Sequence, residues 1–149
     1  MNSKKILPPT FLMAAFIAMF ALHFIAPLAM IVPGYWRLIG LLPLIVGVAV
    51  DIIADRAFQR ARTTIKPFEE SSALVVDGFY AFSRNPMYLG FVLMLFGSAI
   101  LLGSLSPWLV MAVFAVLMDC IYIAVEERML LQTFGPAFDA YKQKTRRWL

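Results

Sequence analysis

The sequence predicts an all-α integral membrane protein with four transmembrane helices, of which the third and fourth form a tight hairpin. The 149 residues are 62% hydrophobic and have a mean hydropathy of +0.81, whereas a soluble domain is about half apolar. The apolar residues also fall into long runs with few or no charges, which is typical of membrane-spanning helices. The length fits one domain that covers residues 1–149.

The first two predicted spans cover residues 9–32 and 36–54. A signal peptide is the alternative for the first run, but its apolar core would have only about 7–15 residues, so we expect a retained helix. His23 lies in this span, and we expect it to pack or to form an interhelical hydrogen bond rather than bind a metal. In the second span Gly40 and Gly47 share a face, which permits close helix packing.

The third predicted span covers residues 86–103 and the fourth covers residues 107–126. Asn85-Pro86 is typical of a helix start, because Asn is a favoured N-cap and Pro suits the first helical position. Only a short turn separates the two spans, so we expect their helices to be antiparallel neighbours.

The fourth helix is expected to continue past its span to Phe134, where Gly135-Pro136 ends it. Such a helix is about 42 Å long, whereas the hydrocarbon core of a bilayer is about 30 Å thick. Glu126 and Glu127 therefore reach the membrane surface, at the depth of Asn85 and on the same side.

The polar segments define the topology. Residues 55–85 are expected to form an extended loop over the membrane surface, and residues 127–149, rich in basic residues, are expected to lie on the bilayer. With four spans, both termini and this loop share one side, which holds all of the 13 Lys and Arg residues except Arg37. The positive-inside rule makes this side cytoplasmic and explains the net charge of +4 without a nucleic-acid partner.

Several classes of protein are excluded by absent patterns. The chain contains no G-x-G and no G-x-S-x-G, which removes the dinucleotide-binding fingerprint, the P-loop and the hydrolase elbow. A single cysteine, Cys120, excludes an internal disulfide and a cysteine-cluster metal site.

Two polar clusters are brought together by the predicted hairpin. The start of the third helix offers Arg84, Asn85 and Tyr88 as donors, along with the positive end of the helix dipole, which suits a carboxylate or phosphate. Glu126 and Glu127 place negative charge opposite. A zwitterionic ligand with an extra cationic centre would fit such a site. The alternative is that these residues only cap a helix, set the topology and end a long helix in water.

Two further acids are candidates for function because charged groups inside a membrane are costly. Asp119 forms a polar stripe with Tyr122 and Glu126 along the fourth helix. Asp51 lies near the end of the second span, where it also has the alternative of reaching water.

Two runs of residues carry a resemblance to a known family. The first contains LVVDGFY at 74–80 and SRNPMYLG at 83–90; the second contains EERML at 126–130, Phe134-Gly135, Tyr141 and RRWL at 146–149. Over residues 74–149 the chain resembles the isoprenylcysteine carboxyl methyltransferase family, within the wider group that includes phospholipid N-methyltransferases. Members of bacterial type share the Arg-Asn-Pro-Met-Tyr run, so we expect a bacterial inner-membrane protein.

The resemblance implies methyl transfer from S-adenosylmethionine to a lipophilic small molecule or lipid held in the membrane, without a Rossmann domain or a metal. It implies a cytosolic cofactor pocket lined by Ser72, Ala73, Leu74, Val75, Tyr80, Asn85, Pro86, Met87, Tyr88 and Glu126. In the resulting hypothesis, Arg84 or Arg146 anchors an anionic acceptor and Glu127 acts as the base for an amine acceptor.

Two departures from the family pattern bear on the substrate. Eukaryotic members have His where Asn85 stands, and Tyr122 stands at the position of a substrate-contacting Arg. Asp119 and Tyr122 are therefore placed on the substrate side, and a prenylated-protein carboxylate is disfavoured as the acceptor.

Two other functions remain open. An NADPH-dependent reductase related to sterol reductases would need a basic pocket for the 2′-phosphate, built from Arg60, Arg62 and Lys66. A non-catalytic helical membrane subunit would tolerate replacement of Asn85 and Glu126 with no loss beyond stability.

Overall fold

The computed structural model describes residues 7–64 and 71–149, and the regular structure in these ranges is helical apart from two isolated β-bridges. The α-helices are α1 (Pro8–Ile25), α2 (Leu41–Arg60), α3 (Pro86–Leu102), α4 (Ser106–Leu117), α5 (Ala124–Phe134) and α6 (Pro136–Lys144). Two 3-10 helices, η1 (Gly34–Gly40) and η2 (Gly78–Ala81), precede α2 and α3, and a π-helix, η3 (Met118–Ile123), joins α4 to α5.

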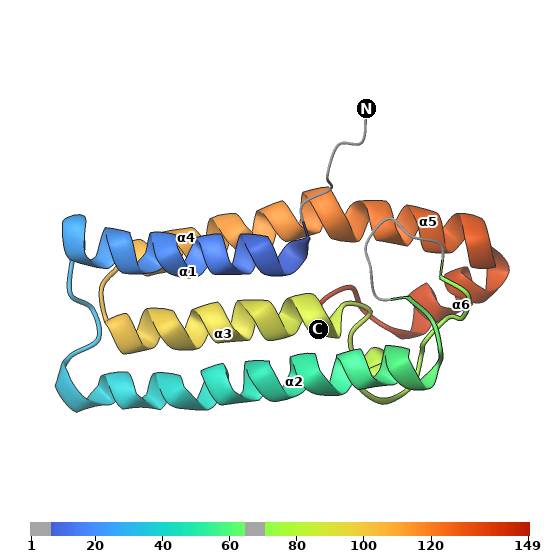
Figure 1. Ribbon diagram of the computed structural model, residues 1–149, viewed down its shortest axis with the longest axis horizontal. Coiled ribbons are helices and arrows are strands. Elements are labelled where there is room, and N and C mark those ends of the chain that lie inside the picture. Colours follow the sequence, from blue (N-terminus) through green and yellow to red (C-terminus); the bar gives the residue numbers. More distant parts are fainter. Residues whose placement is uncertain (1–6, 65–70) are drawn as a thin grey trace.

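The long helices run side by side, with α3 between α2 and the pair formed by α1 and α4 (Figure 1). Within residues 7–64 and 71–149, three helical segments are long and apolar enough to cross a membrane: Pro8–Ile25, Gly34–Arg60 and Ser106–Phe134. The helix Pro86–Leu102 is apolar but shorter. Large apolar side chains on the outside of the bundle, such as Ile17, Ile45 and Val116, are more than half exposed, as expected of a surface that faces lipid. The chain is an all-helical integral membrane protein.

Four glycines form a seam between α3 and the continuous segment η1–α2. Gly47 lies opposite Gly90, and a Cβ atom added to Gly47 would be only 2.6 Å from the carbonyl oxygen of Gly90. Gly40 and Gly97 meet in the same way further along. Gly40 and Gly47 are seven residues apart in one segment, and Gly90 and Gly97 are seven apart in the other. The glycines of one segment therefore face those of the other across an antiparallel contact. The backbones thus approach closely because no side chain stands between them.

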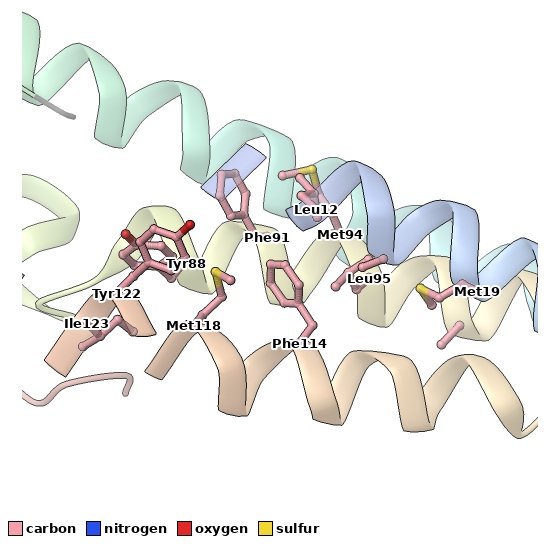
Figure 2. Packing of buried hydrophobic residues seen from close by; sticks show 12 residues of the cluster. Leu12, Met19, Tyr88, Phe91, Met94, Leu95, Phe114, Met118, Tyr122 and Ile123 are labelled. Carbon is pink, nitrogen blue, oxygen red and sulfur yellow. The ribbon is translucent and has the colours of Figure 1, made fainter. Parts of the chain in front are cut away.

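The apolar core lies between α1, α3 and α4 (Figure 2). Met19, Leu95 and Met118 are fully buried there, and Phe91 and Phe114 fill the space between the helices. Tyr88 and Tyr122 end this core on the side of the polar segments, with ring centroids 6.3 Å apart. The core therefore supports the start of α3, where the polar chemistry begins.

The end of the bundle that carries the α3–α4 turn is closed by hydrogen bonds between loops. Gly103, in the left-handed conformation (φ 79°), ends α3, and its carbonyl oxygen accepts from the backbone N–H groups of Ile31 and Val32 at 2.8 and 3.0 Å. His23 Nδ1 lies 2.7 Å from Ser104 Oγ. His23 therefore forms a hydrogen bond, as expected, but its partner lies in the α3–α4 turn rather than in another helix.

The helix bounds differ from the predicted spans in two places. The first helix ends at Ile25 rather than at residue 32, because Pro27 cannot continue it and residues 26–32 bond to the α3–α4 turn instead. The second continues to Arg60, six residues beyond its apolar run, where Gln59 donates to Asp55 at 2.7 Å within the helix. Part of the predicted surface loop is therefore helical, and Lys66 lies outside the described residues.

The fourth helix runs through η3 to Phe134, and Gly135 ends it as expected. The chain then turns back through α6, and its last residues lie beside residues 80–85. The reason is a set of hydrogen bonds: Arg84 N–H donates to the Arg146 carbonyl oxygen at 2.9 Å, and the Tyr141 hydroxyl donates to the Tyr80 carbonyl oxygen at 2.6 Å.

Candidate functional site

A cavity of about 230 Å³ lies at the polar end of the bundle. It is surrounded by the start of α1, the end of α2, residues 71–80, the start of α3, α5 and α6. Its lining residues are Leu7, Pro8, Pro9, Phe58, Thr64, Ser71, Ala73, Leu74, Val75, Tyr80, Arg84, Asn85, Met87, Tyr88, Phe91, Glu126, Glu127, Met129, Leu130, Thr133, Phe138 and Tyr141. Most of this wall is apolar, and the charged groups are Arg84, Glu126 and Glu127.

The start of α3 supplies the polar wall. Pro86 occupies the first helical position, and Asn85 precedes it. The Asn85 side chain does not cap the helix; its Nδ2 donates to the Arg147 carbonyl oxygen at 3.1 Å, while its backbone N–H donates to Ser83 Oγ at 3.2 Å. The prediction that Asn85 caps with its side chain is therefore wrong, because the returning chain end offers it a carbonyl oxygen instead.

Glu126 faces the same cavity from the opposite helix. The Tyr88 hydroxyl donates to Glu126 Oε1 at 2.6 Å, which joins α3 to α5 across the hairpin. Tyr88 is buried, with its ring edge-on to Phe91 and beside Tyr122. The carboxylate of Glu126 is thus held at the cavity wall by a rigid phenol, in a position to accept from a cationic group.

Glu127 is the centre of an ion-pair network. Its Oε1 pairs with Arg84 Nη2 at 2.8 Å, and its Oε2 pairs with Arg147 Nη2 at 2.6 Å. Arg147 Nη1 also reaches Asp119 Oδ2 at 3.2 Å. The side chains of Arg84 and Glu127 are only 10% and 11% exposed, so this pair is screened from water. Guanidinium groups thus pair with both oxygens of Glu127.

The Arg84 guanidinium also has several partners. Besides Glu127, its guanidinium donates to the carbonyl oxygens of Thr145 and Lys142. Hydrogen bonding to Glu127 raises the pKa of Arg147, so the Arg147 guanidinium stays cationic beside the acid. The charge of Glu127 is therefore balanced within the protein. Among the residues that the structure describes, Glu126 accepts a hydrogen bond from the neutral phenol of Tyr88.

Aromatic rings form the rest of the wall. The ring of Phe58 in α2 packs edge-on against Tyr80, with 5.3 Å between the ring centroids. The rings of Phe138 and Tyr141 have their centroids 6.2 Å apart. Burial raises the pKa of both the Tyr80 and Tyr141 hydroxyls, so these phenols stay protonated. A flat apolar group would be surrounded by such rings.

The structure brings most of the predicted site residues to this cavity. Ala73, Leu74, Val75, Tyr80, Asn85, Met87, Tyr88 and Glu126 line it, as do Arg84 and Glu127. Ser72 and Pro86 are adjacent in sequence to lining residues but are not among them; the Ser72 N–H donates to Thr63 Oγ1 at 2.9 Å.

Three predicted site residues lie elsewhere. The Arg146 side chain is exposed and outside the lining, because the chain end presents its carbonyl oxygen to Arg84. Asp119 pairs with Arg147 and accepts from Trp148 Nε1 at 3.0 Å. Tyr122 is 2% exposed behind Tyr88. Arg60 and Arg62, invoked for the reductase alternative, are likewise outside the lining, and Lys66 is not described.

Sequence reasoning missed Phe58, Thr133, Phe138 and Tyr141 as lining residues and Arg147 as the partner of Glu127. The helical spacing of Phe138 and Tyr141 was a usable signal, because it predicts that both face one side. For Arg147 there was none, since Arg146 is its neighbour and has the same chemistry. In the described ranges, no group of three or more His, Cys, Asp or Glu residues is arranged to hold a metal ion.

Comparison with known proteins identifies the family. The model of the phospholipid methyltransferase family matches residues 36–137, about two thirds of the chain. The chain belongs to this family. It is also 34% identical over 71 residues to the protein-S-isoprenylcysteine O-methyltransferase of Schizosaccharomyces pombe, a match that covers 48% of this chain and 30% of that protein. An uncharacterized protein of Haemophilus influenzae is 40% identical over 63 residues, which are 42% of this chain and all of that protein.

The fold matches a solved structure of this group. The eukaryotic intramembrane Ras methyltransferase ICMT (isoprenylcysteine carboxyl methyltransferase) aligns with a TM-score of 0.67 and 23% identity, over 92% of this chain and 50% of that one. The chain thus spans half or less of the length of these two methyltransferases. The predicted resemblance to isoprenylcysteine and phospholipid methyltransferases is confirmed.

Proposed function

We propose that this protein transfers a methyl group from S-adenosylmethionine to a lipophilic acceptor held in the membrane. The observation that carries the proposal is the juxtaposition of Glu126, Tyr88 and Asn85 on one wall of a cavity in a chain of the phospholipid methyltransferase family. Two of the similar proteins, the Schizosaccharomyces pombe protein and the Ras methyltransferase of known structure, are methyltransferases.

The residues of the cavity fit the cofactor. S-adenosylmethionine carries an ammonium group, a carboxylate, a sulfonium and a flat adenine ring. The Glu126 carboxylate suits the ammonium, and the Asn85 region at the start of α3 suits the carboxylate. The aromatic residues Tyr80, Phe58 and Phe138 suit the adenine ring. When bound, the cofactor supplies a methyl group on a positively charged sulfur, which is attacked in line by a nucleophile.

The chain's own contribution is alignment and exclusion of water. Methyl transfer needs its two reactants held in a near-attack arrangement more than it needs acid–base groups. Tyr88 holds Glu126, and Arg84 and Glu127 hold each other, so the polar wall is rigid. The apolar remainder of the wall excludes water from the reacting groups.

The cavity lies where the apolar helices meet the polar end of the bundle, a position that supports access both from water and from the membrane. We propose that four helices span the membrane, that the polar end faces the cytoplasm of a bacterial inner membrane, and that both termini lie on that side. The polar cofactor then arrives from the cytosol and the acceptor from the bilayer. Ala73–Val75, Tyr80, Asn85, Met87, Tyr88 and Glu126 are proposed to contact the cofactor.

The test is isothermal titration of the protein in nanodiscs with S-adenosylmethionine and S-adenosylhomocysteine, and with NADPH in parallel. We expect saturable binding of the first two and a loss of about 10-fold or more in the Glu126→Gln variant, because a charge-assisted hydrogen bond contributes about 1.5–3 kcal/mol. Tyr35→Phe, an exposed residue near the α1–α2 connection, is the matched control. Binding of NADPH alone, or unchanged binding by Glu126→Gln, would overturn the proposal.

A further inference from the structure

Arg147 touches the polar wall of the cavity without lining the cavity itself. Its carbonyl oxygen accepts from Asn85 Nδ2 at 3.1 Å and from Ser83 Oγ at 3.3 Å. Its guanidinium donates to Glu127 Oε2 at 2.6 Å. One residue near the chain's end therefore bonds to two residues of the cavity wall, Asn85 and Glu127, and does so with different atoms.

We propose that Arg147 is the positioning residue of the cavity: its carbonyl oxygen orients the Asn85 amide, and its guanidinium holds Glu127. Through Glu127 it also holds Arg84, because Arg84 Nη2 pairs with Glu127 Oε1, the other carboxylate oxygen, at 2.8 Å. The readout rests on the cofactor binding proposed above. The neighbouring Arg146 contributes only its backbone, because its side chain is exposed.

The π-helix explains why one guanidinium reaches two acids. Asp119 and Glu127 are eight residues apart, and in a regular α-helix this spacing leaves their side chains about 80° apart around the axis. A π turn accommodates one extra residue and so brings the two onto nearly the same face. Arg147 lies against this face. Its Nη1 is 3.2 Å from Asp119 Oδ2, and its Nη2 is 2.6 Å from Glu127 Oε2. A planar fork suits this bridge better than the single ammonium of a lysine.

Asp119 anchors the chain end on the far side of the bridge. Its Oδ1 accepts from the indole N–H of Trp148 at 3.0 Å, and its Oδ2 pairs with Arg147. The two consecutive residues thus share one carboxylate. This assigns a partner to the acid that the sequence marks as intramembrane, and makes it an anchor for the cavity's support rather than a substrate contact.

The first experiment measures S-adenosylhomocysteine binding by isothermal titration in nanodiscs. Arg147→Gln is expected to raise Kd about 10-fold, since it removes charge-assisted bonds to Glu127 and Asp119. Arg147→Lys should recover only part of this loss. Lys144→Gln, which makes the same charge change on the exposed end of α6, should bind like the wild type. Equal binding by Arg147→Gln and wild type would overturn the inference, whereas no binding by the wild type would overturn the proposed function instead.

The second experiment needs no cofactor. Cys120 is the single cysteine, and it lines a shallow hollow with Asp119, Arg147 and Trp148. A bimane label on Cys120 is quenched by a tryptophan in contact, so Trp148 reports whether the chain end is held; Trp148→Phe gives the unquenched reference. We expect Arg147→Gln to move the fluorescence toward that reference while the protein stays monodisperse on size exclusion. Full quenching in Arg147→Gln would show that the guanidinium does not hold this segment. This result does not depend on the proposed function, because the measurement uses no cofactor.

Discussion

The two ends of the helical bundle are held together by different forces. From the loop-closed end, which carries the α3–α4 turn, to the middle of the bundle, the segment η1–α2 touches α3 backbone to backbone through Gly40, Gly47, Gly90 and Gly97. At the cavity end, partly buried ion pairs and side-chain hydrogen bonds join the start of α3, α5 and the last residues of the chain. The glycine contact sets the shape by removing side chains, whereas the cavity end sets the site by adding charged ones. Mutations at the two ends should therefore fail in different ways.

The largest expected effect is at the glycine seam. Gly47→Val should destabilise the protein by about 3 kcal/mol or more, because its side chain would meet the backbone of α3, which cannot move aside without separating the helices. Ala49→Val, on the exposed face of the same helix, is the control and should be nearly neutral. Thermal unfolding in detergent, followed by size-exclusion chromatography, measures both. Similar melting curves for the two variants would mean that the seam is not a close contact.

The ion pair between Arg84 and Glu127 should give the next largest effect. Glu127→Gln is expected to cost about 1–3 kcal/mol of stability, since it leaves the Arg84 guanidinium without a charged partner. Arg84→Gln should cost less, because Glu127 keeps its pair with Arg147. The double variant should cost less than the sum of the two, with a coupling of about 0.5–3 kcal/mol. Chemical unfolding of the four proteins completes the cycle. Additive losses would show that the pair is not coupled, and would weaken the contrast between the two ends.

A smaller effect is expected at Tyr88. Tyr88→Phe keeps the ring that packs on Phe91 but removes the hydroxyl that donates to Glu126. S-adenosylhomocysteine should bind about 5-fold more weakly, corresponding to about 1 kcal/mol for one hydrogen bond, with the melting temperature little changed. Titration and thermal unfolding of the same sample separate the two effects. A lower melting temperature with unchanged Kd would make Tyr88 part of the core only.

The smallest effect is expected at the loop-closed end. Ser104→Ala removes the hydrogen bond to His23 and should cost about 0.6 kcal/mol, the average for such bonds between membrane helices. Cofactor binding should not change, because this bond lies at the opposite end of the bundle from the cavity. Any shift in Kd for S-adenosylhomocysteine would mean that the two ends are coupled rather than independent.

Local patterns were sufficient for much of the fold. Hydrophobic runs predicted the apolar helices, and Asn85-Pro86 and Gly135-Pro136 marked a helix start and a helix end that the structure reproduces. They failed where polar residues extend a helix, as at the end of α2, and where a loop bonds to another loop, as after Ile25. Both outcomes depend on hydrogen-bond partners, which a hydropathy pattern does not contain.

By itself the sequence determined that the chain is a helical membrane protein and that Asn85 and Glu126 reach one level, because helix length and turn length alone set that depth. It also determined the glycine spacing on each of the two facing segments. Only the tertiary structure decided that those glycines meet each other and that Asn85 bonds to the returning chain end. It also decided that Arg147, not Arg146, holds Glu127. Adjacent arginines have the same chemistry, and only the path of the backbone chooses which of them points at the acid.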